Sequence, residues 1–114
     1  MARERDSVGK LVRDKIPDMI RASGRTPHVR TLSTAEYQTA LLDKLREEVA
    51  ELIAAATRDA VIEEAADVLE VLTAIAAEHG ATLDTIVGVT RSKLAERGGF
   101  DMRLSLDAID SASP

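Results

Sequence analysis

The sequence predicts an all-α protein built as an antiparallel bundle of helices. Apolar residues recur at spacings of three and four through the longest segments, which is the period of an α-helix with one face in the core. Only Tyr37 and Phe100 are aromatic, so the core must consist of Leu, Val, Ile and Ala, a composition that suits closely packed helices. The connections between the periodic segments are short, so successive long helices should be antiparallel neighbours.

Length and composition limit the number of domains and the classes of function. A chain of 114 residues has room for one domain, and we expect residues 10–106 to form it, between a loose arm at 1–9 and a tail at 107–114. The absence of cysteine excludes disulfides, thiolate metal sites, Fe–S clusters and a cysteine nucleophile. No apolar run approaches the roughly 20 residues of a membrane span, and the charged first residues do not fit a signal peptide. We therefore expect a cytoplasmic protein without a membrane partner.

The charges are unevenly distributed along the chain. Fifteen basic and 20 acidic residues give a formal net charge of −5, which should repel a nucleic-acid polymer. The first 30 residues are nevertheless basic, whereas most of the acids lie between residues 36 and 78. The basic segment could bind a small anionic ligand beside a metal ion that the acidic segment holds.

The first two predicted helices have clear boundary signals. Pro17 suits the first turn of a short helix over Pro17–Ser23, because its missing N–H has no partner there, and Gly24 should end that helix. The segment Arg25–Leu32 has no helical period and is expected to be extended or a loop. Ser33 and Glu36 form the pattern of a capping box and should open a long helix that ends near residue 56. Its inward stripe is predicted to contain Tyr37, Leu41, Leu45, Val49, Leu52 and Ala56.

Two further helices are predicted after the long helix that ends near residue 56. Asp59 is a candidate N-cap for a helix over Ala60–His79, which Gly80 should close. Another helix should run over Leu83–Arg97, before an alternating segment at Phe100–Leu106 that suits an extended conformation. The inward residues of the Ala60–His79 helix are predicted to be Val61, Ala65, Val68, Leu72, Ile75 and Ala76.

Acidic residues recur at helical spacing on both sides of the turn between the two long helices. The pattern Glu48-x-x-Glu51 is followed after twelve residues by Glu64-x-x-Asp67. With a rise of about 1.5 Å per residue, Glu51 and Glu64 lie about 7.5 and 6 Å from the turn, and the other pair about 12 and 10.5 Å. The two pairs should therefore meet at matched levels between antiparallel helices. Such converging carboxylates supply the hard oxygen ligands that Mg²⁺ or Mn²⁺ prefers.

A plainer interpretation of these acids remains open. Runs of charge are usually solvated helix faces, and a single E-x-x-E has little specificity. The doubled pattern is what favours a metal site.

The same residues carry a resemblance to a known superfamily. The segments Lys44–Glu51 and Glu63–Glu70 resemble the acidic motifs of the all-α nucleoside triphosphate pyrophosphohydrolases, the superfamily of MazG, dimeric dUTPases and phosphoribosyl-ATP pyrophosphohydrolase. The opening Lys10–Pro17 and the closing Lys93–Phe100 are similar to the MazG-like branch. The similarity extends over roughly residues 10–106. This chain departs from longer MazG proteins, which end the region in a more basic stretch containing Pro and His.

The resemblance implies a Mg²⁺-dependent hydrolase that cleaves the bond between the α- and β-phosphates of a nucleotide, releasing a monophosphate and pyrophosphate; Mn²⁺ is a possible substitute. Glu47 could orient or deprotonate the attacking water, or be an exposed helix charge. Glu70, one turn beyond Asp67, could be a further ligand or a supporting group. The implied metal ligands are Glu48, Glu51, Glu64 and Asp67. The expected phosphate-binding residues are Lys10, Arg13, Lys15, Lys93 and Arg97.

Two other functions stay open at this point. Phosphoribosyl-ATP could replace a nucleoside triphosphate as the substrate, and a helical module that oligomerises without catalysis would have similar apolar faces. We also expect a homodimer or homotetramer whose second chain completes the core, because the apolar faces are broader than one helical neighbour can cover. Alternatively, the short N-terminal helix and Phe100–Leu106 cover them within one chain. The residues that broaden these faces are Leu42, Ile53, Ile62, Leu69 and Val71.

Overall fold

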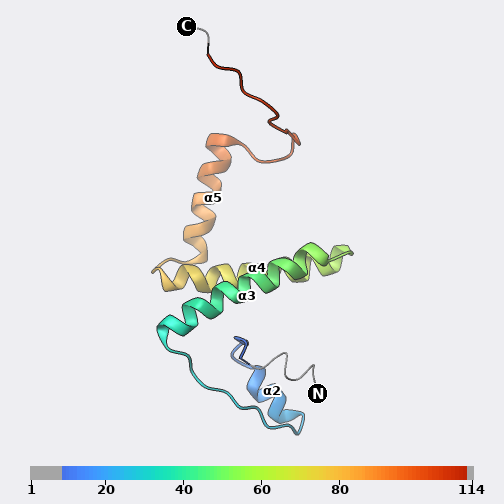
Figure 1. The fold of residues 1–114 in the computed structure, drawn as a ribbon, viewed down its shortest axis with the longest axis vertical. Helices are drawn as coiled ribbons and strands as arrows, with labels where there is room; N and C mark the ends of the chain where they lie inside the picture. Colours follow the sequence, from blue (N-terminus) through green and yellow to red (C-terminus); the bar gives the residue numbers. More distant parts are fainter. Residues whose placement is uncertain (1–8, 113–114) are drawn as a thin grey trace. The chain divides into compact units, whose positions relative to one another are not determined.

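The structure is a computed structural model that describes residues 9–112. The predicted all-α class is confirmed, since the described residues contain four helices and no strand. Most of the predicted arm, residues 1–8, and the last two residues of the predicted tail lie outside the described part. The helices are α2 (Ile16–Ala22), α3 (Thr34–Ala54), α4 (Arg58–Glu78) and α5 (Leu83–Arg97), shown in Figure 1.

The chain divides into two compact units, each of which is described by itself. The first runs to Thr82 and contains α2, α3 and α4, whereas the second begins at Leu83 and contains α5. Among the described residues, no helix has both the length and the apolar character needed to cross a membrane.

The α2 helix follows its predicted boundaries closely. Pro17 lies in its first turn, where no N–H is needed, and the chain leaves the helix through Gly24. Gly24 has a φ of 86°, in the left-handed region that favours glycine. The next residues, up to Ser33, form the expected irregular connection to α3.

The capping box at the start of α3 is confirmed. The Ser33 hydroxyl accepts a hydrogen bond from the Glu36 backbone N–H at 3.2 Å, and the Glu36 carboxylate accepts one from the Ser33 N–H at 3.1 Å. Arg30 also donates to the Glu36 carboxylate, at 2.8 Å. Together these contacts fix the point at which the irregular connection becomes helix.

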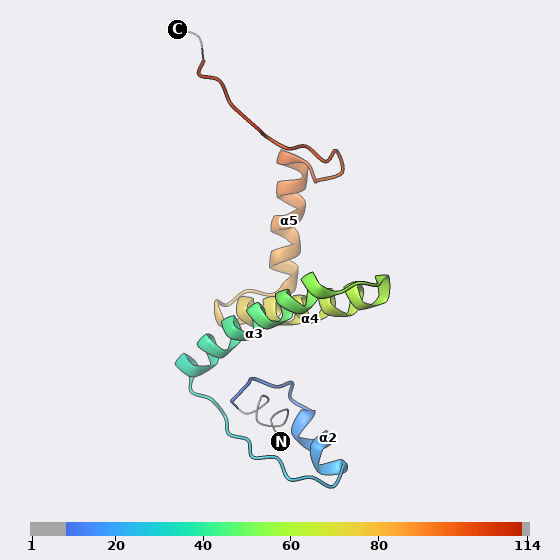
Figure 2. The same ribbon diagram turned by 45° about the vertical axis from the view of Figure 1, so that its right-hand side comes forward.

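The α3 and α4 helices form an antiparallel hairpin. They lie side by side along their length in both views, and the chain reverses direction between them over three residues (Figures 1 and 2). Asp59 was expected to be the N-cap of α4, but this prediction is wrong. Thr57 is the N-cap, and its hydroxyl accepts a hydrogen bond from the Ala60 N–H at 3.1 Å. The helix therefore begins at Arg58, and Asp59 lies in its first turn, where an acid favours the helix dipole.

The inner face of the hairpin is rotated from the predicted stripes. Among the described residues, the buried side chains are Leu41, Val71 and Glu48, with 3, 8 and 6% of their surfaces exposed. Val49, expected in the core, is 36% exposed, because Glu48 takes the inward position and one residue turns a helix by about 100°. Val71 was expected on an outer apolar face, and its burial corrects that prediction.

The same rotation changes the outer part of the predicted core. Val61 and Leu72 of α4 lie at the edge of the face centred on Val71 and are exposed. Ala65 and Ala56 are also exposed, and Ala56 lies beyond the end of α3. The remaining residues named as broadening the apolar faces are exposed: Leu42, Ile53, Ile62 and Leu69.

The second unit consists of α5 and the segment that follows it. The boundaries of α5 agree with the prediction, and Gly98, with a φ of 80°, leads the chain out of the helix. Residues 100–106 include a turn in which the Arg103 N–H donates to the Phe100 carbonyl at 3.0 Å, followed by an irregular stretch. The alternating apolar side chains of this segment are exposed.

Candidate functional site

Three carboxylates from the two helices of the hairpin converge. Glu48 and Glu51 come from α3 and Glu64 comes from α4, and one oxygen of each lies within 4.8 Å of the others. Glu48 and Glu51 share a face because they are three residues apart, and the short turn brings Glu64 to their level. We call these three residues the carboxylate trio.

Two oxygens of the trio have no hydrogen-bond partner in the described structure. Glu48 Oε2 and Glu64 Oε2 are buried and accept no hydrogen bond. An unsatisfied buried polar atom costs about 1–3 kcal/mol, and more when it is charged. Hard oxygens at this spacing, two of them without partners, fit the requirements of a divalent cation such as Mg²⁺ or Mn²⁺.

The pKa shifts of the trio also favour a bound cation. Burial raises the pKa of the Glu48 carboxyl, although the Lys44 ammonium opposes the shift. The pKa of Glu51 is also raised, first by desolvation of its carboxyl and then by the adjacent Glu64. Both shifts mean that the charged forms are disfavoured when no cation is present.

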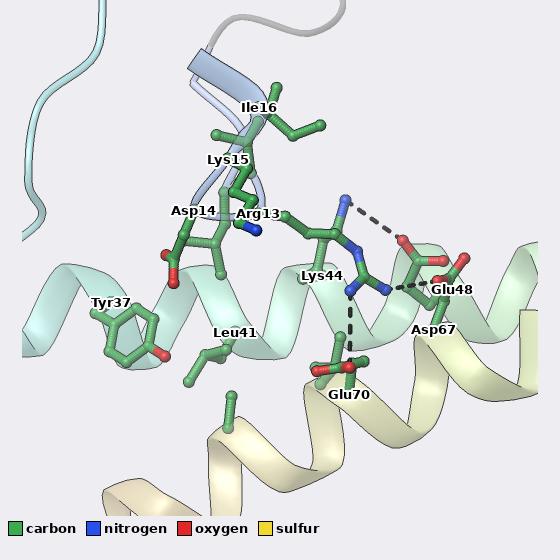
Figure 3. A pocket seen from close by; sticks show the side chains of 14 residues that line it. Arg13, Asp14, Lys15, Ile16, Tyr37, Leu41, Lys44, Glu48, Asp67 and Glu70 are labelled. Atoms are coloured by element: carbon green, nitrogen blue, oxygen red, sulfur yellow. Dashed lines mark hydrogen bonds and ion pairs between the residues drawn. The ribbon is translucent and has the colours of Figure 1, made fainter. Parts of the chain in front are cut away.

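Asp67, the fourth predicted ligand, has a different partner. Its Oδ1 accepts a hydrogen bond from Nη2 of Arg13 at 2.7 Å, and Nη1 of Arg13 lies 3.8 Å from Glu70 Oε1 (Figure 3). Asp67 is not one of the three acids whose oxygens converge. The N-terminal segment and α4 are thus linked beside the trio.

Lys44 belongs to the site but had no role in the sequence interpretation beyond its place in a motif. Its Nζ lies 3.3 Å from Glu48 Oε1 and 3.8 Å from Glu47 Oε1, and only 25% of its side chain is exposed. The available signal was spacing, since Lys44 precedes these acids by three and four residues on one helix. Glu47 is also 3.9 Å from Lys10.

A cavity of about 690 Å³ opens beside these ion pairs. That volume is in the range of small-molecule sites. The N-terminal segment forms one wall with Arg13 and Lys15, and the helices contribute both acidic and apolar side chains. Lys44, Glu48 and Asp67 lie on its lining, so the cavity adjoins the trio.

A family model, phosphoribosyl-ATP pyrophosphohydrolase, matches residues 18–92. The chain belongs to the phosphoribosyl-ATP pyrophosphohydrolase family. This family is part of the MazG-like all-α superfamily that the sequence motifs resemble, so the predicted resemblance is confirmed. Its members are phosphoanhydride pyrophosphohydrolases.

The chain is also similar to an uncharacterized protein of Mycolicibacterium smegmatis (strain ATCC 700084 / mc(2)155). The two sequences are 66% identical over 56 residues, a match that covers 49% of this chain and 57% of the relative. The chain thus matches little more than half the length of that relative. No solved structure matches the chain.

The span matched by the phosphoribosyl-ATP pyrophosphohydrolase family contains the trio and Asp67 but none of the five predicted phosphate-binding residues. Of these five, Arg13 and Lys15 line the cavity and Lys10 lies near Glu47. Lys93 and Arg97 lie on α5, in the second unit, and their contact with phosphate stays a prediction.

Proposed function

We propose that the protein is a divalent-metal-dependent pyrophosphohydrolase that cleaves the α–β phosphoanhydride of a nucleoside triphosphate. The observation that carries this proposal is the carboxylate trio, with two unpartnered buried oxygens, beside a cavity that cationic side chains also line. Membership of a pyrophosphohydrolase family supports it.

Glu48, Glu51 and Glu64 would hold the metal, with Asp67 as a fourth ligand once Arg13 releases it. Bound Mg²⁺, or Mn²⁺ in its place, would neutralise the charge that develops on the phosphate oxygens. When its carboxylates are ionised, the trio offers acceptor oxygens and no donors, so it cannot bind an anion by itself.

The protein residues around the trio would divide the remaining tasks. Water attacks the α-phosphorus, the bond from that phosphorus to the bridging oxygen breaks, and pyrophosphate leaves with the bond's electron pair. Glu47 lies one residue from a ligand and is positioned by two lysines, so its carboxylate is our candidate to take the proton of the attacking water.

The cations of the N-terminal segment would bind the polyphosphate. Arg13 presents a planar fork that suits a phosphate, and Lys10 and Lys15 add point charges. Arg13 would exchange its carboxylate partners for phosphate oxygens when substrate enters. From the second unit, Lys93 and Arg97 are proposed to add phosphate contacts.

Phosphoribosyl-ATP is the second candidate substrate, and the family match specifically favours it. It carries the same α–β phosphoanhydride, so the trio and the cations would act in the same way. Phosphoribosyl-ATP differs from ATP only in a phosphoribosyl group attached to the adenine, which the residues of the trio do not contact in this scheme.

We further propose that the protein is a homodimer or homotetramer. The exposed apolar side chains on the outside of the hairpin extend over both helices, and Ile53 is 79% exposed. Large exposed apolar surfaces are characteristic of interfaces between protein chains.

The proposal is tested by incubating the full chain with Mg²⁺ and a panel of nucleoside triphosphates that also contains phosphoribosyl-ATP, and measuring pyrophosphate and orthophosphate separately. We expect pyrophosphate from at least one compound, and none when EDTA is present or when Glu48→Gln replaces the wild type. Release of orthophosphate alone would contradict cleavage at the α–β bond. Absence of any turnover, with no Mg²⁺ bound, would favour a non-catalytic helical module.

A further inference from the structure

The two oxygens of the Glu48 carboxylate have different surroundings. Oε1 lies 3.3 Å from the Lys44 ammonium, whereas Oε2 is buried without a partner. Only 9% of the Glu48 side chain is exposed, so water cannot readily replace the Lys44 contact. Lys44 is itself three-quarters buried, and its ammonium also lies 3.8 Å from Glu47.

We propose that Lys44 is a positioning residue for the metal site: by holding Oε1 of Glu48, it presents Oε2 to the divalent cation. This inference rests on the proposed function, because it concerns the same metal site. It assigns to Lys44 a role that acts through Glu48, with no contact between the ammonium and the metal.

The geometry makes the ammonium an effective anchor. Lys44 lies one turn before Glu48 on α3, so the helix holds the Cβ atoms of the two residues close together and brings the ammonium within reach of the carboxylate. A carboxylate can rotate about its last bond, and a partner on one oxygen selects the orientation of the other. Partners of this kind around metal ligands commonly affect metal affinity by about 10–100-fold.

A positioning role for Lys44 and simple repulsion between its ammonium and the metal ion predict opposite effects on metal binding when Lys44 is neutralised. If the ammonium acts only by repelling a cation, Lys44→Met should strengthen the binding of every divalent metal. If it positions Glu48, the same variant should weaken binding, and Mg²⁺ should suffer more than Ca²⁺. Mg²⁺ demands near-ideal octahedral geometry, whereas Ca²⁺ accepts irregular ligand sets.

The test is titration calorimetry of Mg²⁺ and Ca²⁺ into the full chain without nucleotide. It uses wild type, Lys44→Met, Lys44→Arg, and the control Arg46→Met, which removes a positive charge from the same helix at a side chain that is 74% exposed. Far-UV circular dichroism checks that each variant is folded, and Lys44→Gln replaces Lys44→Met if the latter does not fold.

We expect Lys44→Met to weaken Mg²⁺ binding by about tenfold or more and Ca²⁺ binding by clearly less. Lys44→Arg should recover most of the Mg²⁺ affinity, because it keeps a charged donor, and Arg46→Met should behave as wild type. Equal or tighter Mg²⁺ binding by Lys44→Met would overturn the positioning role while leaving the proposed function intact. A wild-type protein that binds neither metal would overturn both.

Discussion

Arg13 and Asp67, 54 residues apart in the sequence, are joined by a hydrogen-bonded ion pair of 2.7 Å. The pair ties the N-terminal segment to α4 and occupies an acid that the motif assigns to the metal. In the absence of metal, the guanidinium therefore supplies the positive charge that Asp67 would otherwise lack.

Arg13→Gln should weaken nucleotide binding, because it removes a bidentate phosphate donor. We expect KM to rise about tenfold or more, whereas Mg²⁺ affinity without nucleotide stays the same or increases, because Asp67 becomes available. Steady-state kinetics and calorimetry measure the two effects. Arg21→Gln is a matched control, since Arg21 forms a 2.8 Å ion pair with Asp18 on α2. An unchanged KM in Arg13→Gln would remove Arg13 from the substrate site.

Glu48→Gln should lose Mg²⁺-dependent turnover by at least about 100-fold, because it removes a metal ligand. Without Mg²⁺ the variant should be folded and slightly more stable than the wild type, by about 0.3 kcal/mol. Burial and like-charge repulsion raise the pKa of Glu48 despite the Lys44 ion pair, so the neutral side chain should be the more stable one. Kinetics and urea denaturation measure the two quantities. Glu63→Gln, an exposed acid beside Glu64, is the control for a generic loss of charge. Normal turnover in Glu48→Gln would refute the metal assignment.

Asp67→Asn should lose turnover as Glu48→Gln does, but its effect on stability should be the opposite. The structure gives Asp67 a cationic partner, so the substitution should lower the free energy of unfolding, by less than about 1 kcal/mol because both side chains are partly exposed. Urea denaturation without metal distinguishes this variant from Glu48→Gln by the sign of the change. A gain in stability would mean that the Arg13 ion pair contributes little in solution.

Acid should weaken the start of α3. The Arg30 guanidinium, followed by the Ser33 hydrogen bonds, lowers the pKa of Glu36 to about 2. A lowered pKa contributes stability at pH values above the ordinary range of Glu, and this contribution is lost as the pH falls toward about 2. In thermal denaturation, the wild type should therefore have a higher Tm than Glu36→Gln at pH 6, and the two Tm values should become equal as the pH falls to 2. A difference that does not vary with pH would exclude the ion pair as its source.

The outer apolar face of the hairpin should form an interface. Ile53→Lys places a charge at a side chain that is 79% exposed, so it should weaken the oligomer without disturbing the fold. Light scattering on dilute protein should give a multiple of the 12.3 kDa chain mass for the wild type and a lower value for the variant. Met19→Lys, on α2, is the control at a side chain that is 62% exposed. A fully active wild-type monomer would show that the prediction is wrong.

The features that could be predicted from sequence are those fixed by local chemistry. Ser33 and Glu36 carry their capping contacts within one turn, so their pattern identified the helix start. The approach of Glu51 and Glu64 followed from helical rise and a short turn. Neither inference needed knowledge of how distant segments pack.

Features that depend on helix rotation and long-range contacts were missed. The apolar stripe placed Val49 inward, but the hairpin buries Glu48 in its place, an arrangement that hydrophobic patterning disfavours. The Arg13–Asp67 pair joins residues whose separation carries no periodic signal. Lys44 lies four residues before Glu48, a spacing that allows an ion pair. Many exposed helices have the same spacing with no functional role, so the spacing alone did not identify Lys44.

The burial of Glu48 has a consequence for the stability of the fold. A ligand that binds only the native state stabilises it by RT ln(1 + [L]/Kd), which is about 2.7 kcal/mol at a concentration one hundred times Kd. Leu41 and Val71 are the other buried side chains in residues 9–112, so the Glu48 carboxyl group occupies a position where an apolar side chain would normally stabilise the core. With the proposed cation bound to the trio, the concentration of divalent ions should therefore affect the stability of the hairpin, and removing them should lower that stability even when no substrate is present.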